Sequence, residues 1–241
     1  MSETPSAAPA RAWMRLPSGA HLDLIDPAPQ AWTDRDLAIR LSRTTRWGGE
    51  SRGPLPLSVA QHSLLVLALR RRDAAQPLSA DEALLELLHD AEEGFLGFDC
   101  IAPLKARLGE PLRTVSQRLM QAVVERYALP PWTADGHRLH KRADVAAAAA
   151  EAVHCVGWSR EEVREILGID APVAEEDPLA VDYGEAPWSV WPPPLAAQRF
   201  LDALEELLRR RAAGAGQGAA GAARPQSTRG LSLGGTRPGA A

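Results

Sequence analysis

One stretch of the chain, residues 79–105, constrains its fold most, because it predicts an amphipathic helix with a distinctive polar face. Ser79 and Glu82 have the spacing of a capping box, so the helix is expected to begin there. At about 100° per residue its apolar side chains form one stripe, which consists of Leu84, Leu87, Leu88, Ala91 and Phe95. The opposite side carries an imidazole and several carboxylates, which are those of Glu82, Glu86, His89, Asp90 and Glu93.

The polar face of this helix has two interpretations. Charged residues on a helix commonly form a solvated face. The alternative is a ligand face, because adjacent His89 and Asp90, with Glu93 four residues after the histidine, can hold a divalent cation and a water molecule beside it. A His-Asp pair alone carries little weight, so the ligand interpretation depends on partners elsewhere in the chain.

The composition predicts one large helical domain. The chain has 241 residues, of which 45% are hydrophobic, and its aromatic content is low, so leucine and alanine must fill the core. We expect an all-α fold, a single helical bundle with a small N-terminal β-hairpin, over residues 11–211. Residues 1–10 and 212–241 are expected to be disordered tails, because they lack the apolar surface that would offset the entropy of ordering.

Charge and cysteine content narrow the expected partners and compartment. A formal net charge of −4 gives no reason to expect binding to nucleic acid or to an anionic membrane. Cys100 and Cys155 form neither a zinc pattern nor a disulfide framework, which favours a reducing, cytoplasmic setting. No apolar run approaches about 18 residues and the start lacks a signal-peptide pattern, so neither a membrane span nor an export signal is expected. A homo-oligomer is compatible with the sequence.

Apolar periodicity, caps and breakers divide the chain into elements. Two short runs around residues 17–20 predict a β-hairpin between Trp13 and Leu24. Residues 170–194 are acidic and rich in proline and tryptophan, so they are expected to form a long surface loop. The expected helices are residues 33–46, 58–72, 79–96, 111–127, 133–156, 159–167 and 195–211.

Two residues outside the central stretch are placed to complete a cation site. His62 lies near the start of a helix that is apolar almost all round, where a histidine is either a hydrogen-bonded core residue or a ligand. Asp144 lies in a run of small residues that allows close helix packing, where an unpaired carboxylate would cost on the order of several kcal/mol. Its partner is expected to be either an arginine or a metal ion.

Together, His62, His89, Asp90 and Asp144 form a candidate ligand set on three predicted helices. Two imidazoles and two carboxylates suit a single Mn²⁺, Fe²⁺, Co²⁺ or Zn²⁺ ion, and suit Mg²⁺ less well. Such a cation would lower the pKa of a bound water and neutralise charge developing on phosphorus. Glu93, one turn after His89, is placed to orient or deprotonate that water.

This set resembles the HD-domain metal-dependent phosphohydrolases, which use a histidine on one helix, a His-Asp pair on the next and a distant aspartate. The similarity covers about residues 12–156 and is strongest to the bacterial 5′-deoxynucleotidases and phage-type deoxynucleoside triphosphate hydrolases. In that branch a His-Asp-Ala-x-Glu run precedes Gly-Asp and Pro-x-Lys. Here the run is residues 89–93, followed by Gly97, Asp99 and residues 103–105, and Phe98 separates Gly97 from Asp99, which are adjacent in the family pattern.

The resemblance implies an HD-type helical domain and assigns further site residues. Asp99 would join Glu93 as a second acid near the phosphate. The pair Arg46-Trp47 resembles the pair before the first histidine, in which the arginine contacts phosphate. Lys105 either turns back toward the site, where it would add positive charge for phosphate, or is a solvated side chain after a proline.

The implied activity is hydrolysis of a phosphate ester or anhydride of a small-molecule (deoxy)nucleotide, by attack of a metal-activated water on phosphorus. Both a 5′-nucleotidase and a deoxynucleoside triphosphate hydrolase fit. One alternative is another HD chemistry, such as hydrolysis of a cyclic nucleotide or an alarmone. A second is a nucleotide-binding protein with an HD fold that no longer turns over. The complete ligand set and Glu93 favour an enzyme over that binding protein.

Overall fold

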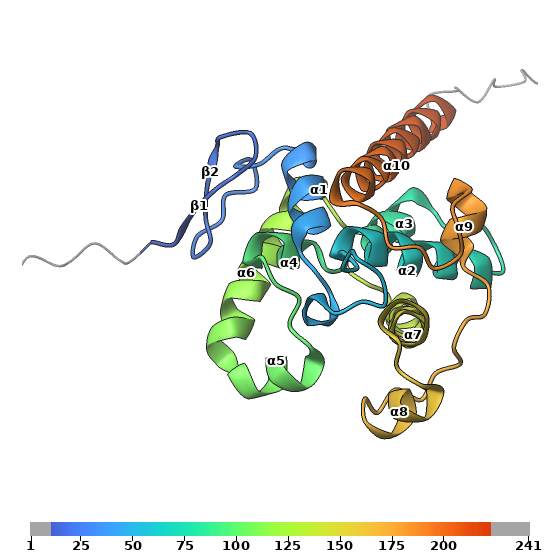
Figure 1. Ribbon diagram of the computed structural model, residues 1–241. Helices are drawn as coiled ribbons and strands as arrows, with labels where there is room; N and C mark the ends of the chain where they lie inside the picture. Colours follow the sequence, from blue (N-terminus) through green and yellow to red (C-terminus); the bar gives the residue numbers. More distant parts are fainter. Residues whose placement is uncertain (1–10, 223–241) are drawn as a thin grey trace, which may run out of the picture.

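The computed structural model describes residues 11–222, which form an array of helices with a two-stranded hairpin at the N-terminal end (Figure 1). The strands are β1 (Trp13–Arg15) and β2 (His21–Asp23), and a 3₁₀ turn spans Trp47–Gly49. The helices are α1 (Asp34–Arg43), α2 (Val59–Asp73), α3 (Ala80–Leu87), α4 (Ala91–Leu96), α5 (Ala102–Leu108), α6 (Glu110–Tyr127), α7 (Ala134–Glu151), α8 (Arg160–Glu165), α9 (Pro178–Tyr183) and α10 (Pro193–Ala222). A π-helical turn, Ala152–Val156, continues α7. The expected mostly helical fold with a small hairpin is confirmed.

Side-chain caps begin four of these helices where the sequence predicts them. Thr33 Oγ1 accepts the amide of Asp36 at 3.1 Å before α1, and Ser58 Oγ accepts an amide at 3.2 Å before α2. Ser79 and Ser159 form complete capping boxes with the glutamates three residues later. Each cap satisfies an amide that the first helical turn leaves unpaired, so local chemistry fixes the start of α1, α2, α3 and α8.

The hairpin is attached to the helices at its turn and at its second strand. β1 and β2 are antiparallel, with Trp13 opposite Asp23 and Arg15 opposite His21. In the turn, the amide of Ser18 donates to Asp36 Oδ1 at 2.7 Å, which joins the hairpin to the first turn of α1. Leu22 is fully buried, so one face of the short sheet covers the helical core.

Helix α2 lies at the centre of the core. Every residue from Val59 to Arg70 is buried, and α2 packs against α3, α7 and α10. Leucine and alanine supply most of the buried side chains, as the composition predicts. Burial of one leucine is worth about 1.5–3 kcal/mol relative to exposure. The all-round burial of α2 therefore makes it the helix on which the other elements are assembled.

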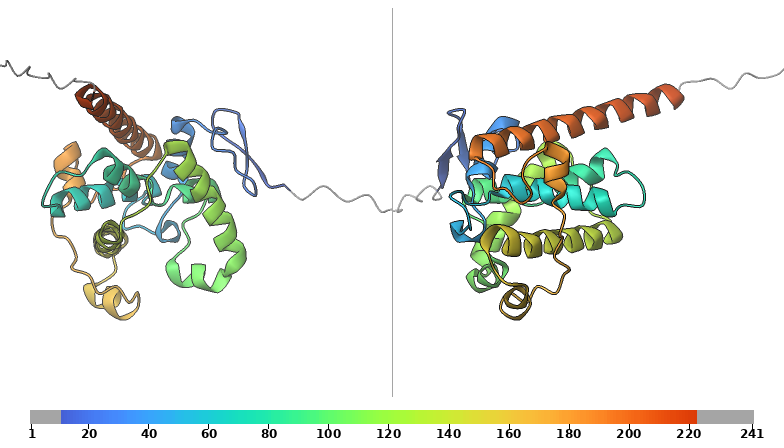
Figure 2. Two further views of the ribbon diagram at one scale, coloured as in Figure 1. Left: turned by 180° about the vertical axis from the view of Figure 1, so that it is seen from behind. Right: turned by 45° about the vertical axis from the view of Figure 1, so that its right-hand side comes forward.

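Helix α10 packs on α1 and α3, and its C-terminal end extends beyond the body of the molecule (Figure 2). Helix α1 also packs on α4, which in turn packs on α6. Within residues 11–222, no helix is both long enough and apolar enough to cross a membrane.

The helix predicted over residues 79–96 is broken, and that prediction is wrong at residues 88–90. Helix α3 ends at Leu87 and α4 begins at Ala91. In a continuous helix the carbonyl of Glu86 would accept the amide of residue 90, but here it lies 2.8 Å from Nδ1 of His89. The histidine ring therefore takes the place of a backbone donor, and the chain turns at His89 and Asp90.

Two short helices lie outside the expected helical segments. Pro103 lies in the first turn of α5, where its missing amide costs no hydrogen bond. Pro178 lies likewise in the first turn of α9, and Asp177 caps that helix by accepting the amide of Leu179 at 2.9 Å. Proline can end a helix or occupy its first turn, so its presence in the sequence does not distinguish a loop from the start of a short helix.

The predicted disorder from residue 212 is also wrong for its first part, because α10 continues to Ala222. Ala212 and Ala213 extend the helix past the basic run at 209–211, and alanine has the highest intrinsic helix propensity. The predictions for residues 1–10 and 223–241 lie outside the described part of the chain.

Candidate functional site

The four predicted ligands come from three places in the fold. His62 lies in the first turn of α2, His89 and Asp90 in the break between α3 and α4, and Asp144 in α7. One ligand atom each of His62, His89 and Asp90 lies within 4.8 Å of the other two. His62 Nε2 lies 3.7 Å from Asp90 Oδ2 and 3.4 Å from Asp144 Oδ1. Asp144 is not part of the group within 4.8 Å and joins the other three through its contact with His62.

Hydrogen bonds hold both histidine rings in one orientation. His62 Nδ1 lies 2.6 Å from Oε1 of Glu151, and His89 Nδ1 lies 2.8 Å from the carbonyl oxygen of Glu86. The Nε2 atoms of both rings are buried and make no hydrogen bond of good geometry among the described residues, although His89 Nε2 lies 3.1 Å from Asp90 Oδ2. In the neutral tautomer with Nδ1 as the donor, Nε2 carries the lone pair, and a carboxylate or carbonyl partner at Nδ1 favours this tautomer when a histidine binds a metal.

The carboxylates around these rings favour the binding of a cation. The pKa values of Asp90 and Asp144 lie well below their ordinary values, because attraction to the imidazoles outweighs the effect of burial. Burial and Arg46 lower the pKa of His62. Glu151 and Asp144 have the larger, opposite effect, so the pKa is raised overall to about 10. The carboxylates therefore attract positive charge to the point where the two Nε2 atoms lie.

The donor set fits a divalent metal ion. Unpartnered imidazole nitrogens beside carboxylate oxygens form the mixed nitrogen and oxygen environment that suits Mn²⁺, Fe²⁺, Co²⁺ or Zn²⁺. No arginine within residues 11–222 pairs with Asp144, which was the alternative from the sequence. Its Oδ2 accepts from Lys141 of the same helix at 3.0 Å, while Oδ1 lies on the His62 side.

Arg46 lies beside this ligand set and contacts three carboxylates. Its Nε lies 2.9 Å from Glu151 Oε2, and its Nη1 lies 3.2 Å from Asp99 and 4.0 Å from Asp90. Attraction to these carboxylates raises the pKa of Arg46 despite its burial. Asp99 therefore reaches the site although Phe98 is inserted before it, and the 43% exposed Phe98 is accommodated at the surface.

Trp47 and Lys105 also lie at the site. Trp47 Nε1 donates to Glu151 Oε2 at 3.1 Å, so the predicted substrate-side tryptophan contacts a buried carboxylate. Lys105 turns back from α5, and its Nζ lies 2.8 Å from Glu93 Oε1. The sequence left two alternatives for Lys105, a solvated side chain or one that turns back. In the structure its side chain points toward the site.

Glu93 is buried, so the solvated-face interpretation of the central stretch is wrong at this residue. Only 1% of it is exposed, and Glu86 is buried to the same degree. Burial, together with repulsion from Asp90 and Asp99, raises the pKa of Glu93 to about 9, and Lys105 opposes part of that rise. A carboxyl group with a raised pKa can hold and release a proton, as acid–base chemistry requires.

Two glutamates of the site were not predicted from the sequence. Glu151 joins Arg46, Trp47 and His62 and is fully buried. It lies seven residues after Asp144, which is two helical turns on the same face, and this spacing could have identified it. Glu86 supports His89 with its carbonyl group.

The side chain of Glu86 forms a separate buried network behind His89. Its Oε1 accepts from Arg70 Nε at 2.8 Å, and its Oε2 lies 2.8 Å from Nδ1 of His140. The His140 ring lies 4.7 Å from the ring of His89, and Trp132 stacks on its other side at 4.7 Å. This network packs the His89 ring from behind and limits its movement.

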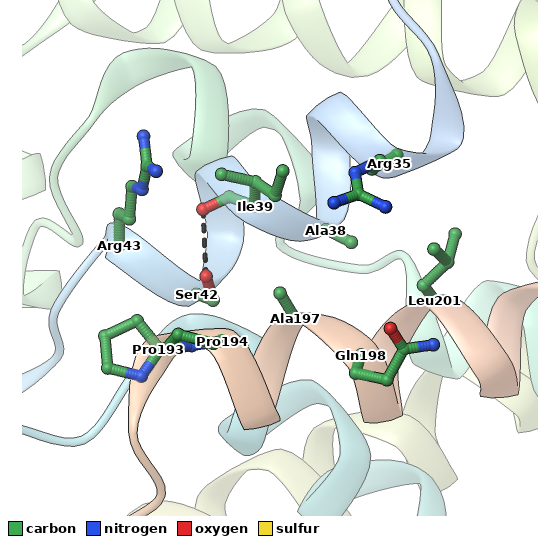
Figure 3. A pocket seen from close by; sticks show the side chains of 10 residues that line it. All are labelled: Arg35, Ala38, Ile39, Ser42, Arg43, Pro193, Pro194, Ala197, Gln198 and Leu201. Atoms are coloured by element: carbon green, nitrogen blue, oxygen red, sulfur yellow. Dashed lines mark hydrogen bonds between the residues drawn. The ribbon is translucent and has the colours of Figure 1, made fainter. Parts of the chain in front are cut away.

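A surface hollow elsewhere in the structure is separate from these residues. It measures about 290 Å³ and lies between α1 and α10, where Arg35, Ile39 and Arg43 face Pro193, Gln198 and Leu201 (Figure 3). No residue of the ligand set lines it. The hollow gives no support to the metal site and is not part of it.

The fold and this geometry define a class: a mostly helical protein with a buried centre of two imidazoles and several carboxylates. The chain belongs to the same family as a protein of Rhodobacter capsulatus described as uncharacterized. The two are 41% identical over 164 residues, which cover 68% of this chain and 83% of that protein. The chain matches no protein-family model.

Proposed function

We propose that the protein is a metal-dependent phosphohydrolase of the HD type that acts on small-molecule (deoxy)nucleotides. The observation that carries the proposal is the pair of buried, unpartnered Nε2 atoms of His62 and His89 beside Asp90 and Asp144. A structural core would leave such atoms hydrogen-bonded, because an unpaired buried polar atom costs about 1–3 kcal/mol. A ligand role accounts for them.

His62, His89, Asp90 and Asp144 would hold one divalent cation, and Mn²⁺, Co²⁺, Fe²⁺ or Zn²⁺ suits them better than Mg²⁺. When bound, the cation supplies a Lewis acid that lowers the pKa of a coordinated water and offsets charge on a phosphate. Glu151 and Glu86 hold the two rings in the tautomer that leaves Nε2 free. The protein thus contributes a preorganised set of donors.

Glu93 and Asp99 are the proposed acid–base residues. Oε1 of Glu93 is occupied by Lys105, whereas Oε2 is buried without a hydrogen-bond partner in the described part of the chain. That oxygen is available to take a proton from an attacking water or return it to a leaving group. Asp99 lies 3.2 Å from Arg46 and would position that guanidinium group.

Arg46, Trp47 and Lys105 are the proposed contacts to substrate. Arg46 and Lys105 place two cations beside Asp90 and Glu93, where they would bind phosphate oxygens. With Cys100 and Cys155 both free, we propose a reducing, cytoplasmic setting.

The proposal is tested by a screen of nucleotides with added Mn²⁺ or Co²⁺, with released phosphate, pyrophosphate and triphosphate measured separately. We expect hydrolysis that stops when the metal is chelated and returns when it is added back. Phosphate release from monophosphates would identify a 5′-nucleotidase, and triphosphate release a triphosphate hydrolase. Bound metal with no turnover of any nucleotide, including cyclic nucleotides and alarmones, would contradict the proposal and favour a binding protein.

The most direct variant is Glu93→Gln, which keeps the shape of the side chain and removes its ability to exchange a proton. We expect the rate at saturating substrate to fall about 10²–10⁴-fold while the bound metal is retained, since a positioned acid–base group contributes that much. Glu161→Gln, an exposed glutamate of α8, is the matched control and should leave the rate unchanged. Full activity of Glu93→Gln would contradict the assignment of Glu93 as an acid–base residue. Loss of the metal would instead show that Glu93 is a metal ligand.

A further inference from the structure

Asp90 belongs to two overlapping groups of potential ligands. The first contains His62 and His89, as described above. The second consists of Asp90, Glu92 and Glu93, and one carboxylate oxygen of each lies within 4.8 Å of the other two. The second group contains no imidazole, so its chemistry is that of a hard cation position with oxygen ligands.

The second group is buried and incompletely satisfied. Glu92 is 7% exposed and Glu93 is 1% exposed. Ser116 of α6 donates to Oε1 of Glu92 at 3.1 Å, and Lys105 donates to Oε1 of Glu93. The Oε2 atoms of both glutamates are buried and have no hydrogen-bond partner among the described residues. Carboxylates gathered in this way repel one another unless a positive charge lies between them.

Lys105 supplies that positive charge. Its ammonium nitrogen lies 2.8 Å from Oε1 of Glu93 and forms no ion pair within 4.0 Å with Asp90 or Glu92. The longer-range attraction of those two carboxylates and the contact with Glu93 raise the pKa of Lys105, although burial opposes the rise. These are the three carboxylates of the second group. The side chain is 38% exposed and comes from the short helix α5, so the ammonium reaches the group from the solvent side.

We propose that Asp90, Glu92 and Glu93 form a second cation position, and that the ammonium of Lys105, paired with Glu93 at its edge, supplies the positive charge there in place of a second metal ion. The protein then binds one metal at the histidine site, while Lys105 provides the second positive charge of the centre. This inference rests on the metal site of the proposed function, but not on the identity of the substrate. It implies that removing the ammonium creates a site for a second ion.

The test is the number of Mn²⁺ ions bound per full-length chain, measured by equilibrium dialysis and elemental analysis. The wild-type protein should bind one ion. Lys105→Met keeps the aliphatic part of the side chain but removes its charge, so this variant should bind two. Two Mn²⁺ ions that share Asp90 would also be magnetically coupled, which changes the electron paramagnetic resonance spectrum from that of an isolated ion.

Three controls make the result specific. Lys105→Arg retains a cation and should bind one ion. Lys141→Met removes an ammonium that lies 3.0 Å from Asp144, on the other side of the centre, and should also bind one ion. Adding Glu92→Gln to Lys105→Met removes a ligand of the second position alone and should return the count to one. If Lys105→Met is insoluble, Lys105→Gln serves in its place.

The outcomes separate this inference from the proposed function. If both the wild-type chain and the Lys105→Met chain bind one ion, the inference of a second cation position is wrong. The metal site at His62 and His89 is unaffected by that result. Two ions in the wild-type protein would also show that this inference is wrong. A wild-type chain that binds none would instead remove the metal centre on which the proposed function depends.

Discussion

At the scale of single residues, Glu151 connects the proposed ligands to the proposed phosphate contact. It is fully buried, and each of its two carboxylate oxygens contacts different residues. Oε1 contacts His62, and Oε2 accepts hydrogen bonds from Arg46 and Trp47. Because it touches no other proposed ligand, Glu151 acts through His62 and Arg46 and is a positioning residue. Its negative charge both orients the imidazole and raises its basicity.

We therefore expect Glu151→Gln to weaken metal binding about 10–100-fold, the usual effect of removing a charged group that supports a ligating histidine. The measurement is the dissociation constant of Mn²⁺ by titration, with folding checked by circular dichroism. Glu50→Gln, at an exposed glutamate after the 3₁₀ turn, is the control and should not change the affinity. Unchanged affinity in a folded Glu151→Gln protein would show that Glu151 has only a structural role.

At the scale of elements, the approach of α4 to α1 decides where His89 and Asp90 lie. Gly94 faces Leu41 of α1, and a Cβ atom at residue 94 would lie 3.0 Å from Leu41 Cγ and 3.2 Å from its backbone nitrogen. Arg40 Nε donates to the carbonyl oxygen of Gly94 at 2.8 Å across the same contact. The absence of a side chain at Gly94 is thus what permits this packing.

Gly94→Ala should lower the free energy of unfolding by about 1–3 kcal/mol, because the added methyl group overpacks a buried contact that includes backbone. Urea unfolding measures the change. The matched variant is Gly214→Ala in α10, where a Cβ would meet nothing within 4 Å. That substitution should leave stability unchanged or raise it by up to about 1 kcal/mol through helix propensity. Equal effects of the two variants would show that the α1–α4 contact is not tight.

At the scale of the whole molecule, α10 holds α1, α3 and the end of α6 together up to residue 211. Arg211 Nη1 donates to the carbonyl oxygen of Tyr127 at 2.7 Å and lies 3.5 Å from Asp81 Oδ1. Arg210 donates to the carbonyl oxygen of Leu78 at 3.5 Å. Beyond Arg211, a Cβ at Gly214 would meet open space, so the helix there projects from the body.

Truncation after Arg211 should accordingly leave the melting temperature and any hydrolase activity unchanged. Truncation after Leu208 removes the contacts of Arg210 and Arg211 and should lower the melting temperature by about 2–4 °C for each 1 kcal/mol lost. Differential scanning calorimetry of the two truncated chains and the full chain measures the difference. A clear loss of stability after the first truncation would mean that residues beyond 211 dock on the protein.

The sequence by itself determined the elements whose causes are local. Thr33, Ser58, Ser79 and Ser159 begin helices because the side chain of each accepts the amide three residues later. Such local contacts do not depend on the rest of the chain. The all-apolar run of α2 likewise predicted a buried central helix. The set of His62, His89, Asp90 and Asp144 was predicted from residue types and spacing, and the structure places these side chains together.

The tertiary structure alone decided the surroundings of those residues. The turn at His89 depends on a ring that takes the carbonyl of Glu86, and no periodicity in the sequence signals it. Glu151 meets His62 across 89 residues of chain, and Lys105 meets Glu93 only because α5, which packs on α6, brings the lysine back to the site. Burial and charge pairing between distant segments depend on packing, and packing turns a pattern of ligands into a centre with defined orientation and charge.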